Sequence, residues 1–338
     1  FDALLKGSGE RQWSSTMAFV RVVATLLRDK QIGPRIVPII ADEARTFGME
    51  GLFRQIGIYV PGGQQFVAQD AGQIMSYREA PDGQLLQEGL SEANGIAAWM
   101  AAGSSYSSHG IALCPFFIYY SMFGFQRVGD FIWAAGDRRC RGFLIGAVAG
   151  RTTLAGEGLQ HDDGHSLLQA SVVPNCLSYD PCYAYEMAII IRAGIQRMMV
   201  DHEDVFYYIT AMNENITHLP MPEGIEQDCL AGMYQLAETQ GKGPRVQLMG
   251  SGMILPEVMA ASVILHDVFG IESDVYSVTS YIELRRDALR IAQSQWLDHA
   301  CEGGSSHIVT QLGSDPSIPV IAASDYMRAV PDLIREFV

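Results

Sequence analysis

Residues 35–43 read RIVPIIADE, a short apolar run that ends in two acidic side chains, Asp42 and Glu43. An apolar run of this length without alternation predicts a strand that is buried on both faces. Similar strand-like runs recur at residues 111–120, 142–148, 172–179 and 205–210. Helical patterns separate these runs, at residues 16–28, 92–105, 122–135 and 185–199. Such alternation predicts an α/β fold with a parallel sheet flanked by helices, whose function is expected at the carboxyl ends of the strands.

A polar stretch containing Pro and Gly runs from residue 213 to 226, and a second from 238 to 244, which predicts a linker. A new cycle of elements follows the linker. It comprises strands at 245–248, 274–278 and 318–322 and helices that end near 269 and 296. We therefore expect two domains, 1–240 and 241–338, the second being a smaller and incomplete α/β domain.

The composition excludes several classes of protein. A formal charge of −15 over 338 residues argues against a nucleic-acid partner or an anionic membrane surface. The longest uncharged run, residues 95–126, is broken by a polar tract and by Pro115, so it predicts buried elements and not a membrane span. Six Cys without CxxC spacing predict reduced thiols in a cytoplasmic protein. The chain begins with Phe1 and not with Met, so we expect a fragment.

Two motifs allow more than one interpretation. The turn Gly250-Ser251-Gly252 between a strand and a helix is a place for an anion, but GxGxxG is incomplete and a structural turn is favoured. Residues 161–165 read HDDGH, which could ligate a metal ion as in a metallohydrolase. Gly164 weakens a helical His pair and no third ligand is evident, so a polar active-site loop is favoured.

Glu92 opens a helix that is almost free of charge. An acid at this position is often only a favourable partner of the helix dipole. Apolar surroundings would instead suit a carboxyl group that relays a proton. The following aromatic cluster, with Phe123 and Tyr120 beside Arg127, is either core or a face on which a planar heterocycle stacks.

Longer strings carry a family resemblance. They are residues 38–55 (PIIADEARTFGMEGLFRQ), 119–129, 150–161 and 273–280. In this order they resemble homodimeric bacterial pyruvate dehydrogenase, the decarboxylating first component of the pyruvate dehydrogenase complex and a thiamine-diphosphate enzyme of the transketolase-like superfamily. The resemblance runs from about Trp13 to the end of the chain. It implies a pyrimidine-binding domain followed by part of a transketolase C-terminal-like domain.

The resemblance also implies roles for individual residues. Glu92 matches the carboxylate that bonds N1′ of the cofactor's aminopyrimidine and activates it. Leu90 matches the apolar residue that holds the two rings of the cofactor in a bent conformation. Phe123 matches the aromatic side chain that stacks on the pyrimidine, with Tyr120 beside it. His161 matches a substrate-side histidine. The remaining matches are polar residues of the cleft and of the network that joins the two sites of a dimer: Asp42, Arg127 and Glu157.

No GDG…N stretch, which holds Mg²⁺ on the cofactor's diphosphate in this family, occurs in the sequence. The resemblance therefore implies Mg²⁺ ligands in a separate N-terminal domain, and a chain that is inactive alone. It further implies a homodimer, pyruvate as substrate and a dihydrolipoyl acetyltransferase partner whose lipoyl group is acetylated. The alternatives are a related transketolase-like 2-oxo acid decarboxylase and a catalytically inert scaffold fragment.

Overall fold

The computed structural model describes residues 1–42, 44–152, 158–297 and 304–338. Its largest sheet, here called the larger sheet, contains six parallel strands in the order β5-β2-β6-β7-β9-β8. The strands are β2 Ile36–Ile40, β5 Leu86–Gln87, β6 Cys114–Tyr120, β7 Phe143–Ala147, β8 Cys176–Tyr179 and β9 Phe206–Thr210. The strands β7, β8 and β9 are buried along their whole length. This burial explains why they are continuous apolar or aromatic runs in the sequence.

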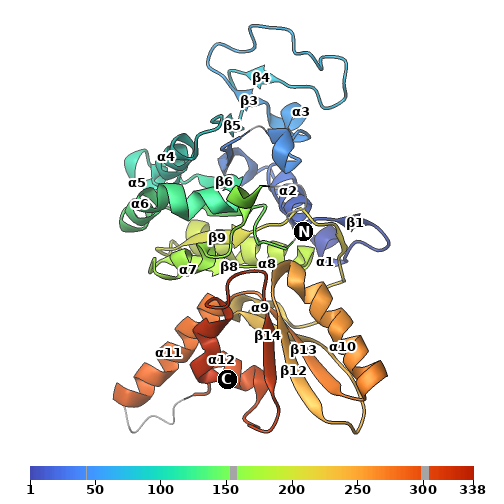
Figure 1. The fold of residues 1–338 in the computed structure, drawn as a ribbon. Coiled ribbons are helices and arrows are strands. Elements are labelled where there is room, and N and C mark those ends of the chain that lie inside the picture. The colour runs from blue at the N-terminus through green and yellow to red at the C-terminus, as the bar shows by residue number, and fades with distance from the viewer. Residues whose placement is uncertain (43, 153–157, 298–303) are drawn as a thin grey trace.

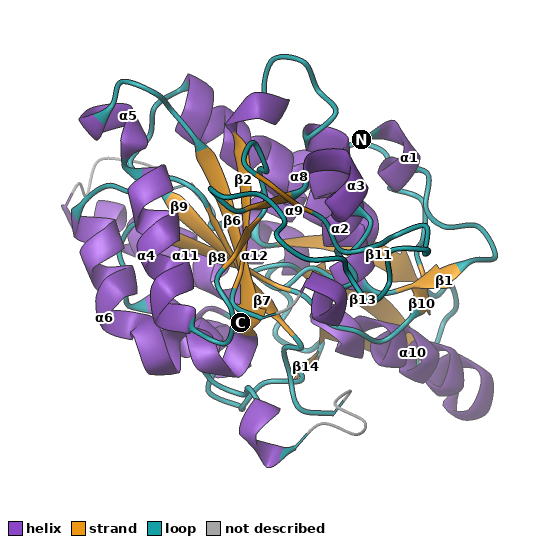
Figure 2. Ribbon diagram, turned by 90° about the horizontal axis from the view of Figure 1, so that it is seen from above, coloured by secondary structure: helices purple, strands orange, loops and turns teal. Residues whose placement is uncertain are grey.

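Helices cover both faces of this sheet, as Figures 1 and 2 show. On one face, α2 (Ser15–Leu26) and α8 (Ala184–Ile195) pack on sheet residues such as Phe116 and Ile118. On the other face, α4 (Glu92–Gly103), α6 (Gly124–Asp137) and α7 (Ser166–Ser171) pack on neighbouring residues such as Phe117. Successive side chains of a strand point to opposite faces, so each core receives alternate residues of β6. The predicted parallel α/β sheet is confirmed.

The second sheet has four strands in the order β11-β13-β12-β14. Its strands are β11 Met233–Glu238, β12 Arg245–Gly250, β13 Glu272–Val278 and β14 Val320–Ala323. The strands β12, β13 and β14 are parallel, whereas β11 pairs with β13 in the antiparallel sense. Its helices are α10 Leu255–Phe269, α11 Tyr281–Leu297 and α12 His307–Leu312. Strand β11 belongs to this sheet although it precedes residue 240. The second sheet therefore begins earlier in the chain than the domain boundary expected after residue 240.

The remaining elements are short. The helices are α1 Asp2–Leu5, α3 Leu52–Ile56, α5 Ser105–Ser108 and α9 Glu226–Ala231, and the strand pairs are β1 Gln12–Trp13 with β10 Ile216–Thr217 and β3 Ile58–Tyr59 with β4 Glu79–Ala80. Turns of 3₁₀-helix occur at η1 Gly33–Arg35, η2 Ala44–Phe47, η3 Ser121–Phe123, η4 Leu159–His161, η6 Gly252–Ile254 and η7 Pro331–Phe337, and a π-turn at η5 Gln196–Val200 continues α8. The two stretches predicted as a linker, 213–226 and 238–244, thus flank α9 and β11, and the first of them contains β10.

One helical segment in the described part of the chain, residues 252–269, is long and apolar enough to span a membrane by length and composition. It comprises η6 and α10, and α10 buries Leu255 and Val258 on the second sheet. A single segment of this kind is also typical of a helix in a soluble α/β domain, so it is weak evidence for a membrane.

The two sheets share a core and a buried polar network. Glu186 of α8 is completely buried and accepts hydrogen bonds from Tyr234 (2.5 Å) and Ser277 (2.6 Å) of the second sheet. Burial raises the pKa of Glu186, against the effect of these hydrogen bonds. One apolar cluster continues from Phe117 in β6 to Tyr276 in β13. The two parts of the described chain therefore pack as one body.

Candidate functional site

Glu92 is the first residue of α4, and its position follows from the helix start. Ser91 caps the helix, because its hydroxyl accepts a hydrogen bond from the Asn94 N–H at 3.2 Å. The next turn packs on the sheet through Ile96, which is fully buried. The cap and this packing hold the Glu92 carboxylate at the carboxyl edge of the larger sheet.

The Glu92 side chain is 12% exposed and forms an ion pair with Arg127, whose Nη1 donates to Oε2 at 3.2 Å. The apolar surroundings expected from the sequence are therefore only part of its environment. The sequence reasoning missed the pair because Arg127 lies on another helix, α6, which packs against α4.

The Arg127 guanidinium also lies over the Phe123 ring, with Cζ 3.8 Å from the ring centroid. A cation at this distance from an aromatic face is attracted by the quadrupole of the ring. Phe123 ends η3, the turn that joins β6 to α6, so the ring stands beyond the end of a buried strand. Carboxylate, guanidinium and aromatic ring thus form one continuous patch.

His161 lies against the same aromatic side chains. Its ring centroid is 5.0 Å from that of Tyr120 and 5.4 Å from that of Phe123, and the Tyr120 and Phe123 rings are 5.9 Å apart. Tyr120 is the last residue of β6, and His161 ends η4 in the connection between β7 and α7. Because β6 and β7 are adjacent parallel strands, their carboxyl ends bring these residues together.

The other expected site residues lie on the same edge or outside the described residues. Leu90 precedes α4 and is 86% exposed, which leaves its side chain accessible to a ligand. Asp42 follows β2, the strand next to β6, and is half-buried. Phe47 links this region to the cluster, with its ring centroid 5.3 Å from that of Tyr120. Glu157 lies outside the described residues.

The HDDGH motif is organised by a buried acid. Asp163 is fully buried and accepts hydrogen bonds from the N–H groups of His165 (3.1 Å) and Ser166 (2.9 Å) at the start of α7. Ser121, which follows β6, donates its hydroxyl hydrogen to the same carboxylate. Among the described residues, no group of three or more His, Cys, Asp or Glu could hold a metal ion. The motif is thus a loop and a helix start.

Asp180 is an acid that the sequence reasoning did not single out. It follows β8 directly, is 3% exposed, and accepts hydrogen bonds from Thr210 (2.6 Å) and Tyr326 (3.2 Å). Burial raises the pKa of Asp180 to about 6, and the nearby charge of Asp325 acts in the same direction. A polar residue immediately after a strand was the available signal in the sequence.

The Gly250-Ser251-Gly252 turn faces this buried acid. The N–H of Gly252 donates to the backbone oxygen of Asp180 at 3.2 Å, and a Cβ at Gly252 would come within 2.8 Å of the carboxylate. The space at the turn is therefore filled by a side chain of this protein, as a structural turn requires.

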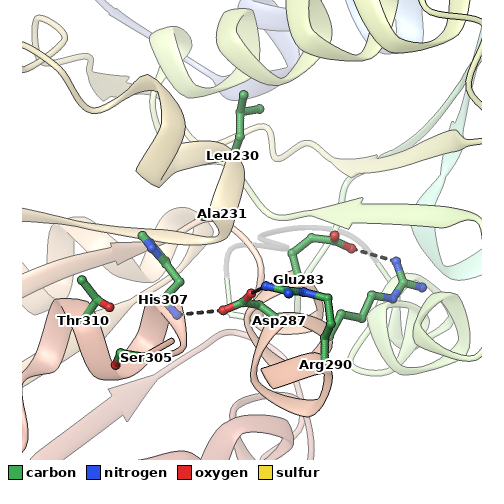
Figure 3. A pocket seen from close by; sticks show the side chains of 9 residues that line it. Leu230, Ala231, Glu283, Asp287, Arg290, Ser305, His307 and Thr310 are labelled. Atoms are coloured by element: carbon green, nitrogen blue, oxygen red, sulfur yellow. Dashed lines mark hydrogen bonds and ion pairs between the residues drawn. The ribbon is translucent and has the colours of Figure 1, made fainter. Parts of the chain in front are cut away.

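A surface cavity of about 540 Å³ lies far along the chain from these residues, between α9, α11 and α12 (Figure 3). Its charged groups are paired with one another: Arg286 with Glu283 at 2.7 Å, and Arg290 with Asp287 at 2.8 Å. His307 donates its backbone N–H to Asp287 at 2.7 Å. Among the described residues, the charged side chains that line the cavity therefore balance one another.

Comparison with solved structures places the fold. Transketolase from Campylobacter jejuni superposes with a TM-score of 0.63 over 98% of this chain and 45% of that chain, at 14% sequence identity. Transketolase from Leishmania mexicana gives a TM-score of 0.65 over 96% of this chain and 40% of that chain, at 13% identity. At such identities the likeness shows a shared transketolase-like fold alone.

Comparison with sequences is more specific. Residues 1–219 match the family model of the pyruvate dehydrogenase E1 component middle domain, and residues 232–336 match that of the transketolase-like C-terminal domain. The chain is 52% identical to the pyruvate dehydrogenase E1 component of Cupriavidus necator, 53% to that of Pseudomonas aeruginosa and 51% to that of Escherichia coli K12. These alignments cover 99–100% of this chain and 38% of each relative's length. The chain therefore belongs to the pyruvate dehydrogenase E1 component family and spans its middle domain and transketolase-like C-terminal domain.

Proposed function

We propose that this chain supplies the aminopyrimidine-binding half of a thiamine-diphosphate site in an enzyme that oxidatively decarboxylates pyruvate. The observation that carries the proposal is the patch formed by the Glu92 carboxylate, the Arg127 guanidinium and the Phe123 ring. The patch stands at the carboxyl edge of the parallel sheet, where α/β enzymes bind ligands. Family membership supports the same reaction, since relatives that share about half of the residues are named pyruvate dehydrogenase E1 component.

The residues present fit an aminopyrimidine. A carboxylate with 12% side-chain exposure can bond a ring nitrogen. Phe123, over whose ring the Arg127 guanidinium lies, is the aromatic side chain of the same patch. Leu90 adds an apolar side chain that is 86% exposed. When bound, thiamine diphosphate supplies the carbanion chemistry that decarboxylation of a 2-oxo acid requires. Mg²⁺ is expected on the diphosphate, held by a domain outside this chain.

Each residue then has a defined task. Glu92 holds a proton at N1′ of the pyrimidine, and the neighbouring Arg127 stabilises the carboxylate when that proton is away. Phe123 and Tyr120 lie on one side of the pyrimidine. His161, in contact with both rings, faces the substrate and orients it. Asp42 would add a polar group to the cleft.

The proposal extends to partners. We expect a homodimer whose chains include an N-terminal domain, pyruvate as substrate, and transfer of the acetyl group to a lipoyl group on the dihydrolipoyl acetyltransferase component. We expect a cytoplasmic bacterial enzyme. The net charge of −15 supports the absence of a nucleic-acid partner.

Substitution of Glu92 tests the proposal in the whole enzyme. Glu92→Gln keeps the size of the side chain and removes the carboxyl group that gains and loses a proton, so we expect pyruvate turnover to fall about 100-fold or more. Asp130→Asn, an exposed acid on α6, is the matched control and should keep wild-type turnover. Normal turnover of Glu92→Ala at low cofactor concentration would contradict the role of Glu92.

Two alternatives are separated by further measurements. A related 2-oxo acid decarboxylase or a transketolase would prefer 2-oxoglutarate or a ketose phosphate in a comparison of turnover with pyruvate. A catalytically inert scaffold is suggested by the share of 38% that the chain covers in its relatives. Calorimetry of this chain with thiamine diphosphate and Mg²⁺ should give weak binding, because the diphosphate anchor is expected elsewhere. Tight binding would contradict that expectation.

A further inference from the structure

We propose that Asp325 is a positioning residue for the loop that carries His161. Asp325 belongs to residues 324–327, here called the β14 tip, which follow the last strand of the second sheet. The described parts of the connection that carries His161, here called the His161 loop, are an outgoing limb, residues 150–152 after β7, and a returning limb, residues 158–164 before α7. The inference rests on the proposed function for the role of His161, and it assigns to the second sheet a part in shaping the site.

The β14 tip first holds the outgoing limb of the loop. The Asp325 carboxylate accepts hydrogen bonds at Oδ1 from the Thr152 backbone N–H (2.9 Å) and from the Thr152 hydroxyl (2.6 Å). The backbone oxygen of Asp325 accepts a third from Nε of Arg151 at 3.4 Å. Three donors from two consecutive residues fix both the position and the direction of this limb.

The same tip holds the returning limb. The N–H of Met327 donates to the oxygen of Gly164 at 2.9 Å, and the N–H of Asp163 donates to the oxygen of Gly150 at 3.1 Å. The two limbs are thus joined to each other and to the β14 tip. His161 lies three residues before Gly164, so its position depends on this closed base.

The fit between the limb and the tip is close. Gly150 has φ +83, and a Cβ there would come within 2.2 Å of Oδ2 of Asp325. Asp325 itself is only 3% exposed. The tip is anchored in turn by Tyr326, whose hydroxyl donates to Asp180 at 3.2 Å.

The hydrogen bonds of this carboxylate are directed to the loop. Both donors described for it, the N–H and the hydroxyl of Thr152, belong to the outgoing limb. Taking a carboxylate out of water costs free energy that such hydrogen bonds offset. We therefore assign to Asp325 the placement of this limb.

The test uses the whole enzyme with three variants. Asp325→Ala removes the acceptor for both Thr152 donors, whereas Asp325→Asn keeps an oxygen that can accept them. Tyr234→Phe is the matched control, because it removes buried hydrogen bonds to Glu186 and Tyr185 that join the second sheet to α8, and these bonds do not involve the loop. The readouts are kcat/KM for pyruvate, the affinity for thiamine diphosphate, and amide hydrogen exchange of residues 158–166.

For Asp325→Ala we expect kcat/KM for pyruvate to fall about tenfold to 100-fold, since small displacements of positioning groups have effects of this size. Cofactor affinity should change less than about twofold, because Glu92 and Phe123 lie on other elements, and exchange of residues 158–166 should become faster. Asp325→Asn should show the wild-type kcat/KM and the wild-type exchange of residues 158–166, and Tyr234→Phe should leave these two readouts unchanged.

Equal losses of kcat/KM in Asp325→Ala and Tyr234→Phe, or unchanged exchange of residues 158–166 in Asp325→Ala, would overturn the inference. Failure of the proposed function would look different. A wild-type enzyme that binds thiamine diphosphate without turning over pyruvate would refute that function, while the exchange measurement would still test the hold of Asp325 on the loop.

Discussion

At the scale of single residues, the site combines groups that come from three connections of one sheet. Glu92 begins α4, Phe123 and Tyr120 follow or end β6, and His161 follows β7. Arg127 connects Glu92 to the Phe123 ring, since it pairs with Glu92 and lies over that ring. The Tyr120 and Phe123 ring centroids are in turn 5.0 Å and 5.4 Å from that of His161.

We expect Phe123→Ala to weaken binding of thiamine diphosphate about tenfold to 100-fold, because stacking of a heterocyclic base on an aromatic side chain contributes roughly 1–3 kcal/mol. Calorimetric titration of the whole enzyme measures the change. Phe131→Ala, at an exposed aromatic on α6, is the control and should not alter the affinity. If Phe123→Leu bound the cofactor as tightly as the wild type, contact area and not stacking would be responsible.

At the scale of elements, α4 owes its position to a close approach to β6. Gly95 faces Phe117, and a Cβ at residue 95 would lie 2.3 Å from the edge of that ring. Phe117 is completely buried, so the ring has no space into which it could move. A glycine one turn after the helix start thus sets how near Glu92 comes to the sheet.

Gly95→Ala should therefore lower the free energy of unfolding by about 1–3 kcal/mol, the usual cost of overpacking a core. It should also weaken cofactor binding, because α4 carries Glu92. Gly129→Ala provides the contrast in α6, where nothing lies within 4 Å of the added Cβ. This variant should be more stable by about 0.5–1 kcal/mol, since Ala favours a helix more than Gly does. Chemical denaturation measures the free energy of unfolding of both variants. Equal changes in Gly95→Ala and Gly129→Ala would contradict the close approach of α4 to β6.

At the scale of the whole molecule, buried acids mark the contact between the two sheets. Asp180 and Glu186 both lie there, and burial raises the pKa of each. An acid whose pKa is higher in the folded than in the unfolded state binds its proton preferentially when folded. The stability that it contributes is therefore lost as the pH rises from about 4 through about 6.

Asp180→Asn should remove the part of the pH dependence of folding stability that comes from Asp180. It keeps an oxygen that can accept hydrogen bonds from Thr210 and Tyr326. We expect the variant to gain about 1 kcal/mol relative to the wild type between pH 5 and pH 7, from the shift of the Asp180 pKa to about 6. Unfolding by denaturant at several pH values measures the difference. Asp130→Asn, at an exposed position, should show no such trend. A difference between Asp180→Asn and wild type that is independent of pH would refute the assignment.

Much of this protein was determined by the sequence alone. Apolar runs without alternation predict the strands β2, β6, β7 and β9, because a strand covered on both faces needs apolar side chains on both. The helical pattern at residues 92–105 predicts α4, and with it the position of Glu92. Local patterns of this kind depend on neighbours along the chain, so the parallel sheet and the residues at its carboxyl edge could be predicted.

Only the tertiary structure decided which distant residues meet. The pair Glu92–Arg127 joins two helices, and Asp325 reaches Thr152 across 173 positions of the chain. The antiparallel edge strand β11 also escaped prediction, because it lies between two polar stretches that resemble a linker and only its first two residues are buried. Contacts between elements depend on how the sheets and helices pack, and no periodicity in the sequence records them. The larger sheet and its carboxyl edge could thus be predicted from local sequence patterns. The hydrogen bonds from the His161 loop to Asp325 form only in the folded chain.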